Sequence, residues 1–128
     1  EQIVTDEARV FMSGRGGEMT RDLLAKGKRF TGVIAADDYM AFDAIRELNR
    51  AGLRVPEDVL VAGFNNIPMS EYLSPALTSV DINAYELGRK AFQLIRAKIE
   101  NKEDKPAHER AGIQIITRES TNGAARHP

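Results

Sequence analysis

Two short apolar runs, each ending in a pair of polar residues, constrain the fold of this chain more than any other feature. The first run covers residues 32–36 and is followed by two aspartates at residues 37–38. The second covers residues 59–64 and is followed by two asparagines at residues 65–66. Continuous apolar runs of this length are typical of parallel strands that are covered on both faces. Because ligands bind beyond the carboxyl ends of such strands, both polar pairs are candidates to face one crevice.

Residues with helical periodicity lie before, between and after the two runs. Apolar residues repeat at helical spacing in three groups: Met19, Leu23 and Leu24; Met40, Ala41, Ala44, Ile45, Leu48 and Ala51; and Leu87, Ala91, Leu94, Ile95 and Ile99. We expect the second helix to begin with Asp38 as its cap and to end at Gly52. The third and longest helix is expected over residues 83–101, where Asn83 and Glu86 have the spacing of a capping box.

The remaining segments read as short strands and connections. We expect extended structure at residues 3–5, 77–82 and 112–117, a loop at residues 13–17, one helical turn at residues 69–72 and a frayed tail from residue 122. Strands therefore alternate with helices at the spacing of βαβ units. This order predicts an α/β fold with a mostly parallel sheet.

Composition limits the classes of function that this chain can have. Its 128 residues are enough for one domain with a hydrophobic core, and no apolar run is long enough for a transmembrane helix. A net charge of −1 argues against a nucleic-acid surface, because phosphate binding depends on clustered lysines and arginines. The absence of cysteine excludes thiol catalysis and fits a reducing compartment. Since the chain begins at Glu1 rather than at a methionine, we expect it to be a fragment.

Several polar residues have both a structural and a functional interpretation. The glycine-rich residues 13–17 could hold a phosphate, but their spacing matches neither the Walker nor the dinucleotide fingerprint, so a plain loop is favoured. Asp38 is favoured as a helix cap, which leaves Asp37 freer to face a ligand. Asn65 and Asn66 both suit a turn, although their place at a strand end also suits ligand binding.

An aromatic residue and two histidines complete the candidates. Phe11 lies in a loop, where it either packs in the core or forms an apolar platform for the face of a sugar. His108 and His127 lie in a charged connection and in the tail, without a serine or aspartate at a recognisable spacing. We therefore expect no catalytic triad.

Five short motifs follow one another in a fixed order along the chain. They are Ala-Asp-Asp at residues 36–38, Gly-Leu-Arg-Val-Pro-Glu-Asp at 52–58, Gly-Phe-Asn-Asn at 63–66, Pro-Ala-Leu-Thr-Ser-Val at 75–80 and Leu-Gly-Arg-Lys-Ala at 87–91. In this order they resemble the effector-binding core of the lactose-repressor (LacI/GalR) family of transcriptional regulators. The sequence Thr-Arg-Glu-Ser at residues 117–120 looks like the last strand of that family. The resemblance covers about residues 11–121.

The resemblance implies a parallel-sheet lobe of a periplasmic-binding-protein-like (type I) fold. Residues 1–121 would form a partial effector-binding domain, with its second lobe at residues 1–81 and 112–121 and a helix at 83–101 that would cross to a first lobe missing from this chain; residues 122–128 would be a tail. In the family, the effector binds in the cleft between the lobes. Its binding changes their relative orientation and so the affinity for operator DNA.

The resemblance also implies which residues line that cleft. Phe11 matches the aromatic that stacks on the effector ring, Asp37 matches the asparagine of Ala-Asn-Asp, and Asn65 matches an aspartate that often anchors sugar hydroxyls. The usual arrangement cannot be copied unchanged, because a carboxylate only accepts hydrogen bonds whereas an amide both donates and accepts them. Arg15 lies near Phe11 in sequence and could pair with an acidic effector. A sugar is the expected effector, with a sugar acid or a phosphate as the alternative.

Three classes of protein compete as interpretations. The first is the effector-sensing module of a cytoplasmic repressor that is not an enzyme, needs no cofactor, forms a homodimer, and binds operator DNA through a domain absent from this chain. The second is a periplasmic sugar-binding protein of the same fold, which the motif at residues 52–68 and the Thr-Arg-Glu-Ser ending disfavour. The third is an unrelated α/β enzyme, which the lack of a nucleophile–base pair disfavours.

Overall fold

A four-stranded sheet lies at the centre of the described structure. The structure is a computed structural model that describes residues 14–27, 29–100, 108 and 110–122. The expected strand at residues 3–5 and the candidate Phe11 lie outside the described residues. The strands are β1 (Gly32–Ile34), β2 (Leu60–Phe64), β3 (Thr78–Asp81) and β4 (Gln114–Ile116), and they lie side by side in this order.

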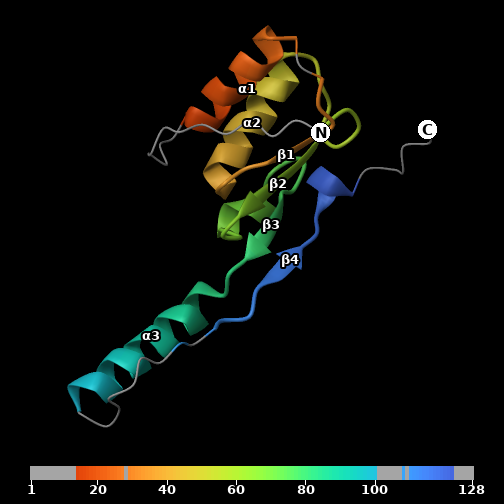
Figure 1. The fold of residues 1–128 in the computed structure, drawn as a ribbon. Coiled ribbons are helices and arrows are strands. Elements are labelled where there is room, and N and C mark those ends of the chain that lie inside the picture. The colour runs from red at the N-terminus through yellow and green to blue at the C-terminus, as the bar shows by residue number, and fades with distance from the viewer. Residues whose placement is uncertain (1–13, 28, 101–107, 109, 123–128) are drawn as a thin grey trace.

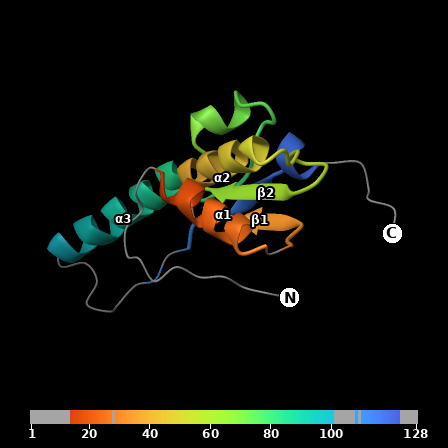
Figure 2. The same ribbon diagram turned by 90° about the horizontal axis from the view of Figure 1, so that it is seen from above.

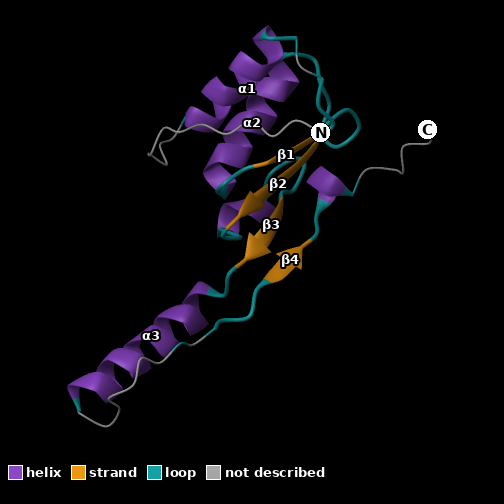
Figure 3. Ribbon diagram, in the orientation of Figure 1, coloured by secondary structure: helices purple, strands orange, loops and turns teal. Residues whose placement is uncertain are grey.

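The direction of the strands confirms the predicted fold class. β1, β2 and β3 run parallel, and β4 returns antiparallel beside β3 (Figure 3). The fold is therefore α/β with a mostly parallel sheet. The extended segments expected at residues 77–82 and 112–117 correspond to β3 and β4, each shorter than expected at both ends.

Helices cover one face of the sheet. α2 (Asp38–Arg50) packs on β2, and α1 (Arg15–Ala25) lies beside α2 (Figure 1, Figure 2). The hydrophobic core on this side is made of Ala35, Ala41, Ile45, Leu48, Val55, Val59, Val61 and Leu77. Helical spacing in the sequence correctly predicted the members of this core that come from α2.

The opposite face of the sheet carries apolar side chains that remain exposed. Ile34 in β1 is 89% exposed, and Ile115 in β4 is 70% exposed. Phe64, in register with Val80, lies between them at 38% exposure. The prediction that residues 32–36 form a strand covered on both faces was therefore wrong for the described chain, where β1 is an edge strand. An apolar run shows what a strand prefers to bury, and the cover itself must come from other segments.

The glycine-rich segment near the N-terminal end begins a helix. Gly14 is the N-cap residue with a φ of 92°, and α1 starts at Arg15, so the prediction of a loop over residues 13–17 was wrong for residues 15–17, while residue 13 lies outside the described residues. A Cβ atom on Gly16 would overlap the carbonyl of Met40 in α2. The glycine thus serves close packing of two helices, which a single sequence does not distinguish from loop flexibility.

The last helix, α3 (Ala84–Ile99), extends away from the sheet and from the other helices (Figure 1). It buries none of its residues. The apolar stripe predicted from its spacing lies in the open: Leu87, Ile95 and Ile99 are 46%, 60% and 76% exposed. The helix ends two residues before the predicted end, and its apolar face contributes no residue to the buried core.

The start of α3 fits the expected capping box only in part. The Asn83 side chain accepts a hydrogen bond from the Glu86 N–H at 3.4 Å, as expected. The Glu86 carboxylate does not return to the Asn83 N–H, because it binds Arg89 at 2.8 Å. The Asn83 N–H instead donates to Asp81 Oδ1 at 2.7 Å, so a residue of β3 completes the cap.

The segment after β4 fastens the end of the described chain to the sheet. Residues 117–120, expected as a last strand, follow β4, and a 3-10 turn, η2 (Glu119–Thr121), begins within them. The buried Ser120 hydroxyl donates to the Val61 carbonyl at 2.6 Å and accepts from the Thr78 N–H at 2.8 Å. Among the described helices, none is long and apolar enough to cross a membrane.

Candidate functional site

A buried aspartate joins the loops that follow two parallel strands. Asp38 is 1% exposed. Its Oδ2 accepts hydrogen bonds from the Ile67 N–H and the Ser70 hydroxyl, both at 2.8 Å, and its Oδ1 accepts from the Ser79 hydroxyl at 2.6 Å. These bonds tie the first turn of α2 to the loop after β2, to the 3-10 turn η1 (Pro68–Glu71), and to β3. A side chain at Gly63 would overlap Asp38, so glycine is required there for this packing.

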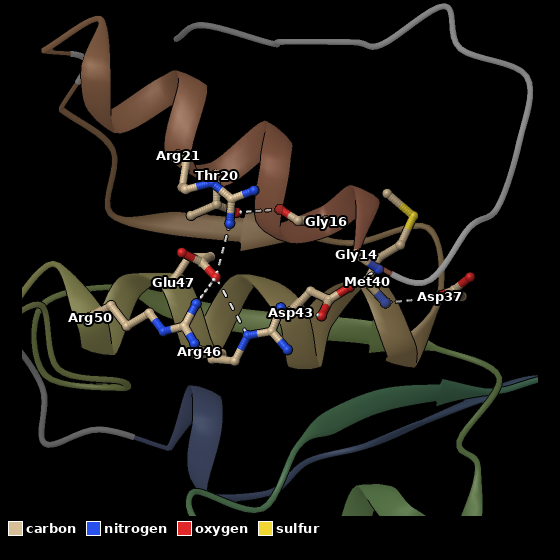
Figure 4. A network of polar contacts seen from close by, with 10 residues as sticks. All are labelled: Gly14, Gly16, Thr20, Arg21, Asp37, Met40, Asp43, Arg46, Glu47 and Arg50. Atoms are coloured by element: carbon tan, nitrogen blue, oxygen red, sulfur yellow. Dashed lines mark hydrogen bonds and ion pairs between the residues drawn. The ribbon is translucent and has the colours of Figure 1, made fainter.

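The helix cap is the neighbouring aspartate, which corrects the sequence interpretation. Asp37 has an extended backbone, and its Oδ1 accepts from the Met40 N–H at 2.7 Å (Figure 4). The prediction that Asp38 caps α2 was therefore wrong. Two adjacent aspartates both suit the cap by sequence, and the hydroxyl partners that draw Asp38 inward lie far away along the chain. Asp37 remains half-buried at the end of the loop after β1.

The two asparagines after β2 form a left-handed turn. Asn65 has a φ of 95° and Asn66 a φ of 48°, a region that asparagine adopts more readily than most residues. The Asn65 N–H donates to the Val80 carbonyl at 2.9 Å, and the Asn66 N–H donates to the Ser79 hydroxyl at 3.0 Å. The predicted turn role of Asn66 agrees with this backbone. The side chain of Asn65 is exposed beyond the strand end.

The side chain of Asn66 belongs to a polar network that the sequence interpretation missed. It donates to Asp81 Oδ2 at 3.2 Å and accepts from Arg118 Nη2 at 2.8 Å. Arg118 also donates from Nη1 to the Leu77 carbonyl at 2.7 Å. The three residues come from the loop after β2, from β3 and from the segment after β4, so no local pattern in the sequence marks them.

Arg15 lies in the first turn of α1, which contacts the first turn of α2. It is the first residue of α1, and it pairs with Glu18 at 2.9 Å. The first turn of α1 lies against the first turns of α2, because the Gly14 N–H donates to Asp43 Oδ2 at 2.6 Å (Figure 4). Asp37 and Asn65 follow the carboxyl ends of the neighbouring parallel strands β1 and β2, Arg15 begins the helix beside α2, and Phe11 lies outside the described residues.

A buried glutamate in α2 forms ion pairs that hold α1 against α2. Glu47 of α2 is 4% exposed and pairs with Arg21 of α1 at 3.1 Å and with Arg50 at 2.8 Å (Figure 4). Desolvation raises the pKa of Glu47, but the hydrogen bond and charge of Arg21, together with Arg50 and Arg46, outweigh it and hold the pKa below its ordinary value. The carboxylate therefore stays charged and keeps α1 in place against α2.

The chemistry of this edge suits hydrogen bonding to a polar ligand. A carboxylate at residue 37 and an amide at residue 65 together offer acceptors and donors to hydroxyl groups. No cluster of three or more histidine, cysteine, aspartate or glutamate side chains among the described residues is arranged to hold a metal ion. The one histidine that the structure describes, His108, is exposed in the connection that leads to β4.

Comparison with known proteins places this chain in a family. A family profile described as a periplasmic binding protein-like domain matches residues 1–121. The HTH-type transcriptional repressor PurR of Vibrio cholerae serotype O1 is 39% identical over 88 residues, which are 69% of this chain and 25% of that protein. The HTH-type transcriptional regulator GntR of Pseudomonas aeruginosa is 36% identical over 106 residues, which are 83% of this chain and 31% of that protein.

Solved structures of transcriptional regulators have a similar fold. The transcriptional regulator CelR in complex with cellobiose superposes with a TM-score of 0.82 and 31% identity, covering 92% of this chain and 37% of that one. A LacI family transcriptional regulator from Enterococcus faecium with bound ribose gives a TM-score of 0.76 and 34% identity, covering 87% of this chain and 41% of that one.

The fold and the family match therefore define a periplasmic-binding-protein-like domain of the kind found in LacI-type regulators. The chain belongs to the LacI/GalR family of transcriptional regulators. It spans about a quarter to a third of the length of the two relatives described above. Their names favour a regulator over a periplasmic sugar-binding protein, which was the competing interpretation of the same fold.

Proposed function

We propose that this chain is the effector-sensing module of a LacI/GalR-type transcriptional repressor and is not an enzyme. The observation that carries the proposal is the similarity to two transcriptional regulators over 69% and 83% of the chain, within a periplasmic binding protein-like domain at residues 1–121. Effector binding beyond the ends of β1 and β2 would favour one arrangement of the lobes and so change the affinity of the full-length protein for operator DNA. The full-length protein would act in the cytoplasm as a homodimer, without a cofactor, and would contact DNA through a domain outside this chain.

The effector that we propose is a sugar or a sugar derivative. The cellobiose and ribose bound to two structural neighbours support this class. Asp37 would accept from a sugar hydroxyl with Oδ2, since Oδ1 is engaged by the Met40 N–H. The Asn65 amide would both donate and accept, and Phe11 would stack on the apolar face of the ring. Arg15 would favour a sugar acid if its side chain turned from Glu18 to the ligand.

The division of the chain between two lobes is also a proposal. Residues 1–81 and 112–121 would form the second lobe, helix 83–101 would cross to the first lobe, and residues 122–128 would be a tail. The absence of any buried residue in α3 supports this division, because an amphipathic helix is stable when its apolar face packs against a partner. A complete first lobe would supply that partner.

Substitution of Asn65 tests the proposed site. Isothermal titration calorimetry would compare the full-length protein with its Asn65→Ala variant against cellobiose, ribose and gluconate. We expect Asn65→Ala to weaken binding of the preferred sugar by about tenfold, the effect of losing one or two hydrogen bonds, while the unfolding midpoint stays unchanged. Asn49→Ala, an exposed position on α2, is the matched control.

Two results would contradict the proposed function. One is an affinity of Asn65→Ala that equals the affinity of the original chain for every sugar that binds. The other is full-length protein that binds its operator equally with and without a saturating concentration of that sugar, since an effector must bind the two states of the protein differently.

A further inference from the structure

A side-chain bridge connects the turn beside the proposed effector site with the start of α3. Asn66 lies at one end of the bridge, and its Nδ2 donates to Asp81 Oδ2 at 3.2 Å. Asp81 uses its other oxygen, Oδ1, to accept the Asn83 N–H at 2.7 Å. One carboxylate therefore holds both the turn after β2 and the N-cap residue of α3.

The orientation of the Asn66 amide is determined by the groups at its two ends. A carboxylate can only accept hydrogen bonds and a guanidinium can only donate them. The Asn66 amide must therefore turn its NH₂ group to Asp81 and its oxygen to Arg118, as the two distances of 3.2 and 2.8 Å show. A flipped amide would oppose donor to donor and acceptor to acceptor at the two ends, so the side chain has one orientation.

The junction at the other end of the bridge sets the direction of α3. Asn83 has a left-handed backbone with a φ of 49°. α3 buries none of its residues, and it extends away from the sheet (Figure 1). Besides this junction, Lys90 of α3 donates to the Arg110 carbonyl in the segment before β4 at 2.7 Å. A helix with no buried residue takes its direction largely from the residues that join it to the body, as hinges do in two-lobed proteins. Asp81 anchors that joint to the turn that contains Asn65.

We propose that Asn66 is a positioning residue that couples the conformation of Asn65 to the direction of α3 through Asp81. The Asn65 N–H donates to the Val80 carbonyl, and the side chain of the next residue donates to Asp81. A ligand that changes the conformation of Asn65 therefore also changes the geometry of the Asn66–Asp81 hydrogen bond. Through this bridge, ligand binding at Asn65 would change the conformation at Asn83, where α3 begins. This inference rests on the proposed function for its ligand, but the bridge itself is measurable without one.

Exchange of the two residues gives a sharp test. In Asp81→Asn, the oxygen of the introduced amide can still accept the Asn83 N–H, but its NH₂ group then opposes the NH₂ group of Asn66. In Asn66→Asp, two carboxylates oppose each other. The double variant Asn66→Asp/Asp81→Asn restores the bond between the two positions with reversed polarity, because the carboxylate introduced at position 66 accepts from both Arg118 and the amide at position 81. Aspartate also tolerates the left-handed backbone at position 66.

The direction of α3 can be measured with spin labels. The chain has no native cysteine, so two introduced ones are labelled without interference. Labels at the exposed positions Asn49 in α2 and Gln93 in α3 report the distance between the two helices by double electron–electron resonance, which changes when α3 changes direction. We expect each single variant to shift or broaden the distance distribution and to move the NMR amide signal of Asn65. The double variant should restore both, and Glu86→Gln, which alters the first turn of α3 outside the bridge, should leave the Asn65 signal unchanged.

Restoration by the double variant decides the result. Single variants with an unchanged distance distribution and an unchanged Asn65 signal would overturn the inference, and so would a double variant no closer to the original than the worse single variant. A single variant that fails to fold, rescued by the exchange, would support the bridge as the required contact.

Sugar binding separates the two proposals. If cellobiose or ribose binds, we expect each single variant to weaken its affinity by about fivefold, as the loss of one hydrogen bond implies, and the exchange to recover it. If neither sugar nor gluconate binds the full-length protein, the proposed sugar site fails, while the spin-label result still decides whether the bridge sets the direction of α3.

Discussion

At the scale of single residues, identical neighbours at the two strand ends have different roles. Asp37 caps α2 from a half-buried position, whereas Asp38 is buried and accepts three hydrogen bonds. Asn65 presents an exposed side chain, whereas Asn66 is locked between Asp81 and Arg118. In each pair, one residue holds the loop in place and the other remains near the surface where a ligand would bind.

The roles of the two aspartates predict unequal costs of substitution. Asp38→Ala leaves two buried hydroxyls and the Ile67 N–H without their acceptor, so we expect it to lower the free energy of unfolding by about 3 kcal/mol or more. Asp37→Ala removes a helix cap and should cost about 1 kcal/mol. Urea unfolding followed by circular dichroism measures both. If Asp38→Ala cost no more than Asp37→Ala, the assignment of Asp38 as the buried anchor would be wrong.

At the scale of elements, the helices of this chain differ in how closely they approach a neighbour. α1 approaches α2 so closely that its glycines face the backbone and side chains of α2. Glu47 and the arginines around it hold the two helices together beyond this contact. α3 has no such neighbour among the described residues, and a Cβ atom added at Gly88 would meet no atom within 4 Å. Glycine is therefore required for close packing in α1, whereas in α3 a side chain would fit at Gly88.

Two glycine-to-alanine substitutions test this difference. Gly16→Ala places a methyl group against the Met40 carbonyl, and we expect it to lower the free energy of unfolding by about 2 kcal/mol despite better helix propensity. Gly88→Ala meets only open space and should increase the helicity of α3, since alanine is favoured over glycine by about 1 kcal/mol in a helix. Urea unfolding measures the first effect and far-ultraviolet circular dichroism the second. A Gly16→Ala variant as stable as the original chain would show that the helices separate easily.

At the scale of the whole molecule, sequence patterns predicted the order of the elements better than their surroundings. Alternation and helical spacing are local properties, so they correctly identified β2, α2 and α3 and the end of β2 before residue 65, although β1 ends at Ile34, two residues before the predicted end of its run. The partners of Asp38 lie 29 to 41 residues away, and no spacing rule connects them. The exposure of Ile34 was likewise unpredictable, because burial depends on which other segments cover the sheet.

The exposed stripe of α3 predicts that the isolated 128-residue chain self-associates. Leu87, Ile95 and Ile99 are 46–76% exposed, and burying one such side chain contributes about 2 kcal/mol. Sedimentation velocity over a concentration series should therefore show a growing fraction of oligomer. We expect Ile95→Lys to suppress it, and Gln93→Lys, which makes the same charge change at an exposed polar position, to leave it intact.

The open face of the sheet offers a second apolar surface, and the same measurement distinguishes the two. Ile34 is 89% exposed on that face, and β1 ends the described sheet with an unpaired edge. If Ile34→Lys abolished association while Ile95→Lys did not, the contact would lie on the sheet and the prediction for α3 would be wrong. A chain that stays monomeric at its highest attainable concentration would contradict both, because it would show that an amphipathic helix of this kind remains in water without a partner.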